Sequence, residues 1–153
     1  SGQERSPVDL AAVARDVVAD LAPTAIKSGY DLSLEAPEAP VMVAGDAHAI
    51  SRALTNLVGN SVAHGGGAGQ IRVVVGADRT IDVTDEGPGV PEALRPRLFE
   101  PFSRGGSNIE GCGLGLHITR EIMRAHGGEV SLVPGGPGAT FRLSFARDDR
   151  DRA

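Results

Sequence analysis

The sequence predicts an α+β domain in which a mixed, mostly antiparallel sheet packs against about three helices on one face. Three observations predict this class. Helical and strand-like segments alternate along the chain without an internal repeat. The length of 153 residues suits one domain with one core. Hydrophobic residues make up 41% of the chain but aromatic residues only 3%, so the core must be mainly aliphatic.

Four segments carry helical signals, and two of them have an aspartate where a helix should begin. Asp9 caps the first, and Pro23 is expected to end it. Asp46 caps the second, which ends before three consecutive glycines. The expected helices span residues 9–22, 46–64, 91–98 and 114–125.

Short runs rich in β-branched residues predict the strands, and glycine-containing segments separate them. Two of the runs form a hairpin around the turn at residues 76–79. The expected strands span residues 31–35, 41–44, 71–75, 80–85, 129–133 and 139–145.

Charge and composition exclude several functions. Fifteen basic and 20 acidic residues give a net charge of −5, which argues against nucleic-acid binding. No apolar run approaches the roughly 18 residues of a membrane span, and no signal peptide opens the chain. The single cysteine cannot form an intrachain disulfide, in agreement with a cytoplasmic domain. We expect residues 8–146 to form the domain, with a polar linker at 1–7 and a charged tail at 147–153.

Two asparagines give the first chemical signal. Asn56 and Asn60 lie four residues apart on the second expected helix, at the border of its apolar stripe. An amide oxygen at such a border suits a hard cation such as Mg²⁺. The alternative is a pair of solvent-facing amides on an ordinary helix.

The segment DEGPG at residues 85–89 gives the second signal. Asp85 shares a strand face with Ile81 and Val83, so its carboxylate should point inward at the end of the strand. A carboxylate there can accept a hydrogen bond from the amino group of adenine, and Gly87 and Gly89 let a flat ligand approach the backbone. A simple Asp/Gly turn is the alternative.

Glycines 111, 113 and 115 give the third signal, because they precede and enter a helix whose first amides can bind phosphate. Neither a P-loop nor a dinucleotide-binding motif fits the spacing. The only lysine, Lys27, lacks a preceding glycine, and Leu116 stands where the dinucleotide motif needs its last glycine.

Together these segments resemble a known family. In order they are NLVGN (56–60), DEGPG (85–89), LFEPFSRG (98–105), GCGLGL (111–116) and GATF (138–141), and HGG (126–128), which ends the last expected helix, also fits. The series resembles the N box, first glycine box, F box, second glycine box and final Gly-x-Thr-x-Phe segment of the ATP-binding domains of sensor histidine kinases. The resemblance implies the two-layer α/β sandwich, or Bergerat fold, shared with gyrase-type, MutL-type and Hsp90-type ATPases.

The resemblance also implies ligands and residue roles. ATP and Mg²⁺ would be the ligands, with Asn60 coordinating Mg²⁺ and Asn56 and Arg104 assisting catalysis. Thr140 would reach the Asp85 carboxylate or its bound water, and residues 103–113 would belong to a lid over the triphosphate. The nucleotide would contact Asn60, Asp85, Gly87, Gly89, Gly111, Gly113, Leu114, Gly115, Leu116 and Thr140.

The implied partners lie outside this sequence. They are a dimerisation and phosphoacceptor domain and a response regulator, because none of the four histidines has the context of the family's acceptor histidine. Direct membrane contact is not expected, although the parent protein could carry a membrane anchor.

Two departures bear on activity. Asn56 stands where the related ATPases have a glutamate base, which favours transfer to a protein over hydrolysis. Ala63 stands where the N box commonly has a basic residue. A weak or inactive ATP-binding module is therefore one alternative, and an anti-sigma-type serine kinase of the same fold is another.

Overall fold

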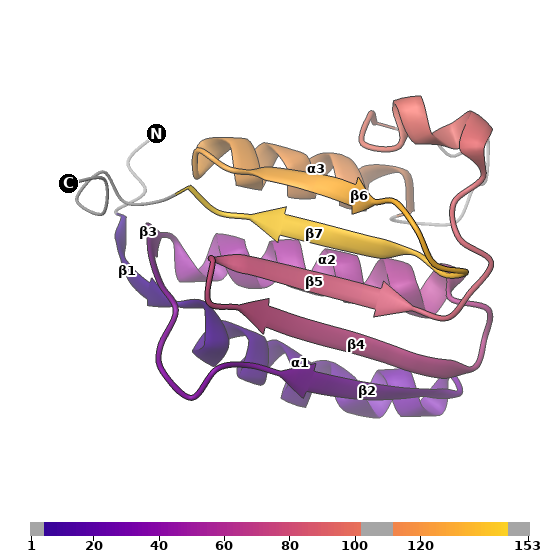
Figure 1. Cartoon of the computed structure of the whole chain (residues 1–153), viewed down its shortest axis with the longest axis horizontal. Helices are drawn as coiled ribbons and strands as arrows, with labels where there is room; N and C mark the ends of the chain where they lie inside the picture. Colours follow the sequence, from indigo (N-terminus) through magenta and orange to yellow (C-terminus); the bar gives the residue numbers. More distant parts are fainter. Residues whose placement is uncertain (1–4, 102–111, 147–153) are drawn as a thin grey trace.

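Five strands form the main sheet, in the spatial order β2-β4-β5-β7-β6 (Figure 1). The computed structural model describes residues 5–101 and 112–146. Within the sheet, β2 and β4 run parallel, and every other neighbouring pair is antiparallel. The strands are β2 (Tyr30–Glu35), β4 (Gly69–Gly76), β5 (Thr80–Asp85), β6 (Glu129–Val133) and β7 (Thr140–Ser144).

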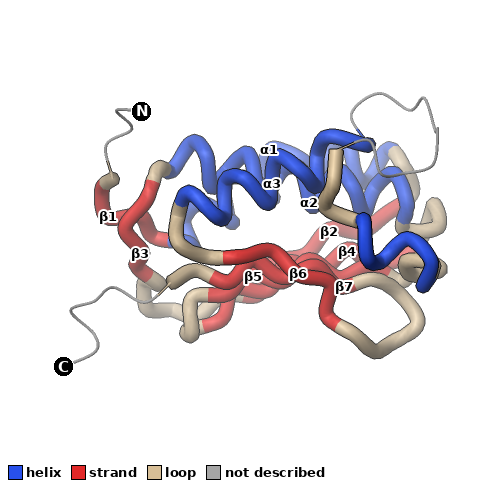
Figure 2. The backbone as a smooth tube through the Cα atoms, turned by 90° about the horizontal axis from the view of Figure 1, so that it is seen from above, coloured by secondary structure: helices blue, strands red, loops and turns tan. Residues whose placement is uncertain are grey.

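Among the described residues, helices cover one face of this sheet, as Figure 2 shows, which confirms the predicted α+β sandwich. Along that face α1 packs against α2, and α2 packs against α3. The short 3₁₀ helix η1 follows the end of β5. The helices are α1 (Leu10–Lys27), α2 (Ala47–His64), η1 (Glu92–Arg97) and α3 (Cys112–Ala125).

The core lies between the sheet and the helices, where the strand period of two places one set of side chains. Val73 and Val83 are opposite each other on β4 and β5, and Phe141 lies opposite Val83 on β7. All three are fully buried. Phe141 is the largest fully buried side chain of the described residues, and the rest of the core is mainly aliphatic.

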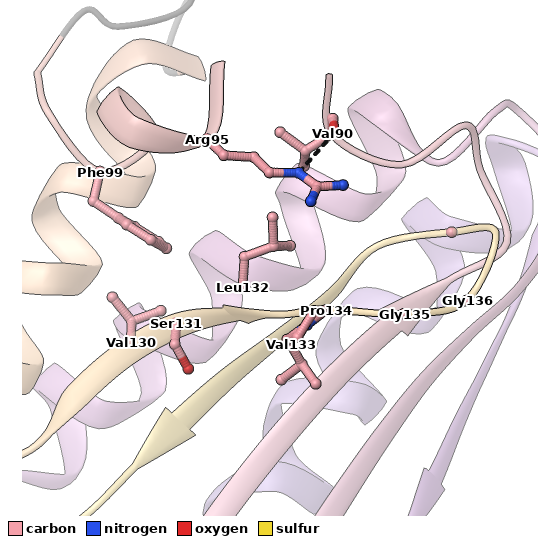
Figure 3. Close-up of a pocket in the computed structure, with 11 residues that line it drawn as sticks. Val90, Arg95, Phe99, Val130, Ser131, Leu132, Val133, Pro134, Gly135 and Gly136 are labelled. Atoms are coloured by element: carbon pink, nitrogen blue, oxygen red, sulfur yellow. Dashed lines mark hydrogen bonds between the residues drawn. The ribbon is translucent and has the colours of Figure 1, made fainter. Parts of the chain in front are cut away.

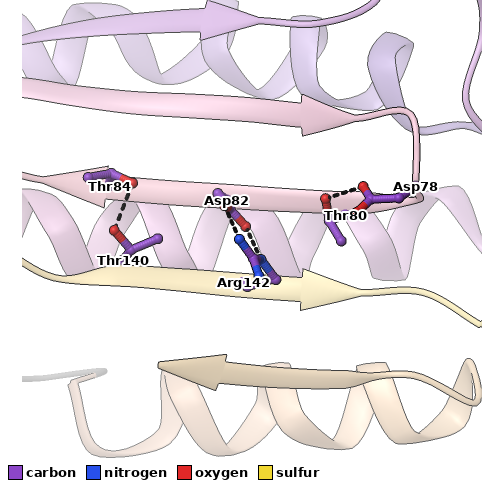
Figure 4. Close-up of polar contacts among 6 residues, drawn as sticks. All are labelled: Asp78, Thr80, Asp82, Thr84, Thr140 and Arg142. Atoms are coloured by element: carbon purple, nitrogen blue, oxygen red, sulfur yellow. Dashed lines mark hydrogen bonds and ion pairs between the residues drawn. The ribbon is translucent and has the colours of Figure 1, made fainter. Parts of the chain in front are cut away.

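The opposite face of the sheet is polar, and no helix of the described residues covers it (Figures 2 and 4). Arg142 on β7 donates two hydrogen bonds to Asp82 on β5, at 2.8 and 2.9 Å. The hydrogen bond and the charge of Asp82 raise the pKa of Arg142. Polar cross-strand pairs of this kind let one face of an antiparallel sheet meet water.

Pro23 does not end the first helix, and that expectation is wrong. The helix continues to Lys27 and buries Ala25 completely in its last turn. Pro23 is exposed. The helix ends at Ser28, whose backbone N–H bonds to the carbonyls of Thr24 and Ala25. Packing of the last turn thus outweighs the helix-breaking tendency of one proline.

A short strand that the sequence did not signal opens the described chain. Strand β1 (Ser6–Asp9) pairs antiparallel with β3 (Met42–Gly45) to form a separate two-stranded sheet. Two residues of the expected linker, Ser6 and Pro7, therefore take part in pairing with β3. Asp9 caps α1 as expected, and its carboxylate also accepts from the N–H of Val41.

Candidate functional site

The asparagine pair lies on the half of α2 that faces the start of α3. Asn56 donates from its side-chain Nδ2 to the carbonyl oxygen of Gly115, at 3.3 Å. The same carbonyl accepts from the hydroxyl of Thr119 at 2.8 Å. Asn56 therefore joins α2 to the first turns of α3, and the sequence alone did not indicate Thr119.

Asn60 lies one helical turn further along α2 and is half-buried. No hydrogen bond among the described residues engages its side chain. In that part of the chain, no group of three or more His, Cys, Asp or Glu side chains is placed to hold a metal ion. The Asn60 amide oxygen fits a Mg²⁺ ion that takes its other ligands from phosphate and water.

Asp85 ends β5 with its side chain on the core face, as the strand period predicted. The residue is only 4% exposed. One carboxylate oxygen, Oδ1, accepts from the N–H groups of Gly87 at 2.9 Å and Ala139 at 3.3 Å. The other, Oδ2, accepts from no group among the described residues, so it can receive a hydrogen bond from a ligand such as the amino group of adenine.

Close backbone packing explains two glycines next to Asp85. A Cβ atom at Gly87 would lie 2.6 Å from the carbonyl carbon of Gly65, which follows the end of α2. A Cβ at Gly138 would lie against the carbonyl oxygen of Asp85. Gly89 instead has a φ of +78°. The glycines thus fit the turn around Asp85 tightly between α2 and β7.

Thr140 does not reach Asp85, and that expectation is wrong. Its hydroxyl lies 2.9 Å from the hydroxyl of Thr84, its partner on β5, on the uncovered face of the sheet (Figure 4). Asp85 follows Thr84 directly and therefore points to the other face. From the β7 side, the preceding residue Ala139 contacts Asp85 through its backbone.

The remaining expected nucleotide contacts lie at α3. Leu116 is 2% exposed and belongs to the core. Leu114 is 38% exposed. Gly113 lies in the first turn of α3. Arg104 and Gly111 lie outside the described residues, as does most of the expected lid.

A cavity of about 310 Å³ lies under η1, against the edge strand β6 (Figure 3). Phe99 and Leu132 line it, and Arg95 donates from Nε to the carbonyl of Val90 at its rim. Phe99 also meets Phe141 edge-to-face, with ring centroids 6.1 Å apart. None of the asparagines or Asp85 lines this cavity.

The arrangement defines a class of protein. A one-sided sandwich that carries asparagines on α2, an inward aspartate at the end of β5 and glycines around it belongs to the Bergerat class. Residues 45–149 match the family model described as "Histidine kinase-, DNA gyrase B-, and HSP90-like ATPase". The chain belongs to that family.

The chain is similar to one part of several longer sensor kinases. It is 35% identical over 146 residues to the probable sensor histidine kinase TcrY of Mycobacterium tuberculosis, covering 90% of this chain and 30% of that protein. It is 36% identical over 121 residues to the sensor protein KdpD of Escherichia coli, covering 74% of this chain and 13% of that protein. The chain thus spans less than a third of either relative.

The solved structures that resemble this chain include a histidine kinase catalytic domain and an ATP-binding domain. The catalytic domain of histidine kinase ThkA, in a nucleotide-free form, superposes with a TM-score of 0.80 at 28% identity and covers 92% of this chain and 94% of its own. The ATP-binding domain of PrrB from Mycobacterium tuberculosis gives a TM-score of 0.73 at 27% identity, with coverage of 96% and 100%. The chain is therefore an ATPase-type domain of the sensor histidine kinase kind. In the described part of the chain, no helix has the length and apolar character to cross a membrane.

Proposed function

We propose that this chain binds Mg²⁺-ATP and donates the γ-phosphoryl group to a histidine of a separate dimerisation and phosphoacceptor domain. The observation that carries the proposal is Asp85, a buried carboxylate with one oxygen held by two backbone N–H groups and the other open to a ligand. An adenine amino group can donate to that oxygen. The 6-carbonyl of guanine would repel it, which makes the site selective for ATP.

The triphosphate would extend from Asp85 toward Asn60 and the start of α3. Asn60 supplies one oxygen ligand for Mg²⁺, which neutralises phosphate charge. The first amides of α3 lie at a helix N-terminus, whose partial positive charge and unpaired N–H groups favour a bound phosphate. Asn56 holds α2 and α3 together through Gly115, so it keeps these groups at a constant separation.

The chemical step needs positioning more than a base. An imidazole nitrogen of the acceptor forms a bond to the γ-phosphorus as the bond from that phosphorus to the bridging oxygen breaks, which yields phosphohistidine and ADP. An amide such as Asn56 cannot deprotonate water, and this supports transfer over hydrolysis. The acceptor domain and the response regulator that takes the phosphoryl group are partners in the parent protein's signalling.

A transfer assay tests the proposal directly. The chain is mixed with radiolabelled ATP and Mg²⁺, with or without the acceptor domain of its parent kinase. We expect acid-labile phosphate on the acceptor domain and none on the chain alone. Acid-stable label on serine would favour the serine kinase alternative. Binding of ATP without any transfer would favour an inactive module, for which the exposed Ala63 is the main indication.

A further inference from the structure

The only tyrosine of the chain is buried at the C-terminal end of α2. Tyr30 begins β2 and is 3% exposed. Its hydroxyl donates to the carbonyl oxygen of Val62 at 3.0 Å and accepts from the N–H of Gly67 at 2.8 Å. Val62 lies in the last turn of α2, where carbonyls lack partners within the helix. The tyrosine hydroxyl therefore serves as a side-chain cap that ties the helix to the turn after it.

The turn after α2, residues 65–67, contacts Tyr30 on one side and the turn after β5 on the other. A Cβ atom at Gly65 would lie 3.2 Å from the Tyr30 hydroxyl. A Cβ at Gly87 would lie 2.6 Å from the carbonyl carbon of Gly65. Tyr30, Gly65 and Gly87 are thus stacked without room for another side chain, so a shift of Gly65 must move one of its neighbours.

Gly87 is also a hydrogen-bond donor to Asp85. Its N–H lies 2.9 Å from Asp85 Oδ1, and it is one of the two backbone groups that orient this carboxylate. The contacts therefore run without interruption from the Tyr30 hydroxyl, through Gly65 and Gly87, to Asp85. In the intervening turn, Gly66 and Gly67 adopt φ values of +92° and +83° that only glycine tolerates well.

We propose that Tyr30 is a positioning residue for nucleotide selectivity: its hydroxyl holds the turn after α2, and through Gly87 it fixes the direction of the Asp85 carboxylate. This inference rests on the proposed function, in which Asp85 receives the adenine amino group. Tyr30 itself touches no nucleotide. Its effect is on how well Asp85 is aligned before the ligand arrives.

The test compares ATP with inosine triphosphate (ITP), which has a carbonyl oxygen in place of the adenine amino group. Tyr30→Phe keeps the ring but leaves the Val62 carbonyl and the Gly67 N–H without their partner. We expect the ratio of ATP to ITP affinity to fall by about threefold to tenfold, the size of one misaligned hydrogen bond. Calorimetric titrations of both nucleotides with Mg²⁺, well below the unfolding temperature, measure this ratio.

Two further variants separate the possible results. Thr84→Val removes one hydroxyl of the Thr84–Thr140 pair, next to Asp85 but on the uncovered face, and it should leave the ratio unchanged. Asp85→Asn should reduce the ratio more than Tyr30→Phe does. If Asp85→Asn lowers the ratio and Tyr30→Phe does not, Tyr30 has no positioning role. If Asp85→Asn leaves the ratio at its original value, the adenine assignment in the proposed function fails, and this inference fails with it.

A measurement on the unsubstituted chain does not depend on how Tyr30→Phe folds. Incorporation of 3-fluorotyrosine labels one site only, because the chain contains one tyrosine. We expect saturating ATP to shift the fluorine resonance and saturating ITP to shift it less. Equal shifts with the two nucleotides, or no shift with either, would contradict the coupling between Tyr30 and the adenine end of the site.

Discussion

At the scale of single residues, Asp85 shows how the fold orients a carboxylate before a ligand binds. Burial alone would make a charged carboxylate unfavourable, so its partners matter. Two backbone N–H groups, from Gly87 and Ala139, satisfy one oxygen and fix the plane of the group. The second oxygen is then oriented before any nucleotide arrives, which reduces the loss of side-chain entropy on binding.

Asp85→Asn tests this orientation. The amide has the same size but can donate as well as accept, and it lacks the charge. We expect ATP affinity to fall about tenfold to a hundredfold, in line with the loss of a charge-assisted hydrogen bond of about 1.5–3 kcal/mol. Selectivity for ATP over GTP should fall as well. Titration of both nucleotides measures the effect, and unchanged affinities would place the adenine elsewhere.

Asn60→Ala tests the metal assignment. The variant removes one oxygen ligand of Mg²⁺, so it should weaken ATP binding in Mg²⁺ and abolish phosphoryl transfer. ADP binding without metal should change much less, because the adenine contacts are intact. Parallel titrations with Mg²⁺ and with a chelator make the comparison. Equal losses under the two conditions would indicate that Asn60 has a structural role only.

Two glycine-to-alanine substitutions, one at a tightly packed glycine and one at an open glycine, test the packing around Gly87 by their effect on folding stability. Gly87→Ala places a Cβ 2.6 Å from the backbone of Gly65, and we expect a loss of about 1–3 kcal/mol of folding stability. Gly59 lies within α2 with no atom of the described residues within 4 Å of an added Cβ, so Gly59→Ala should stabilise the domain by about 1 kcal/mol. Urea unfolding of both variants measures this, and a shift of the same sign in both would refute the packing argument.

At the scale of elements, His126 joins the end of α3 to the start of α2. Its Nδ1 lies 2.8 Å from the carbonyl oxygen of Ile122, and its Nε2 accepts from the N–H of Asp46 at 3.1 Å. A carbonyl can only accept and a backbone N–H can only donate, so Nδ1 is the donor and Nε2 the acceptor of this ring. Gly45 makes room for this ring, because a Cβ there would lie 2.6 Å from the His126 Cδ2 atom.

Replacing this histidine tests the joint between the two helices. His126→Phe keeps an aromatic ring of similar size but leaves the Asp46 N–H and an Ile122 carbonyl lone pair without a partner. We expect a loss of about 1–3 kcal/mol of folding stability. The exposed His48 on the first turn of α2 provides the control, since His48→Gln should change stability by about 0.5 kcal/mol or less. Equal effects of the two substitutions in urea unfolding would show that the buried hydrogen bonds contribute nothing.

At the scale of the whole molecule, the site draws its parts from both layers. Asn56 and Asn60 come from the helical layer, and Asp85 and Ala139 come from the sheet or its margin. A ligand that contacts both layers binds only when they are assembled. Ligand binding and global unfolding are therefore thermodynamically linked.

Thermal unfolding with and without nucleotide tests this linkage. Mg²⁺-ATP at about 100 times its dissociation constant should add about 2.7 kcal/mol of stability. For a chain of this size that corresponds to an increase of roughly 5–10 °C in the unfolding midpoint. GTP at the same concentration should have a much smaller effect. A midpoint that does not respond to ATP would mean that the nucleotide does not bind the folded domain.

The sequence by itself determined the order and class of nearly all elements and the inward direction of Asp85. These follow from local rules: aspartate caps at Asp9 and Asp46, glycine stops, and a period of two along β5. The same period also rules out a contact between Thr140 and Asp85, because the register between β5 and β7 puts Thr140 opposite Thr84. That register is a relation between two distant segments, and neither segment alone contains it.

Only the tertiary structure decided the features that depend on contacts between distant segments. Strand β1 exists because β3 pairs with it, and α1 passes Pro23 because its last turn packs into the core. Tyr30 and Gly67 meet across 37 positions of the chain, and Gly65 in the turn before β4 meets Gly87 in the turn after β5. Such contacts depend on how the layers pack. Helix caps and strand periods depend on neighbours along the chain, and these local relations are all that a single sequence displays.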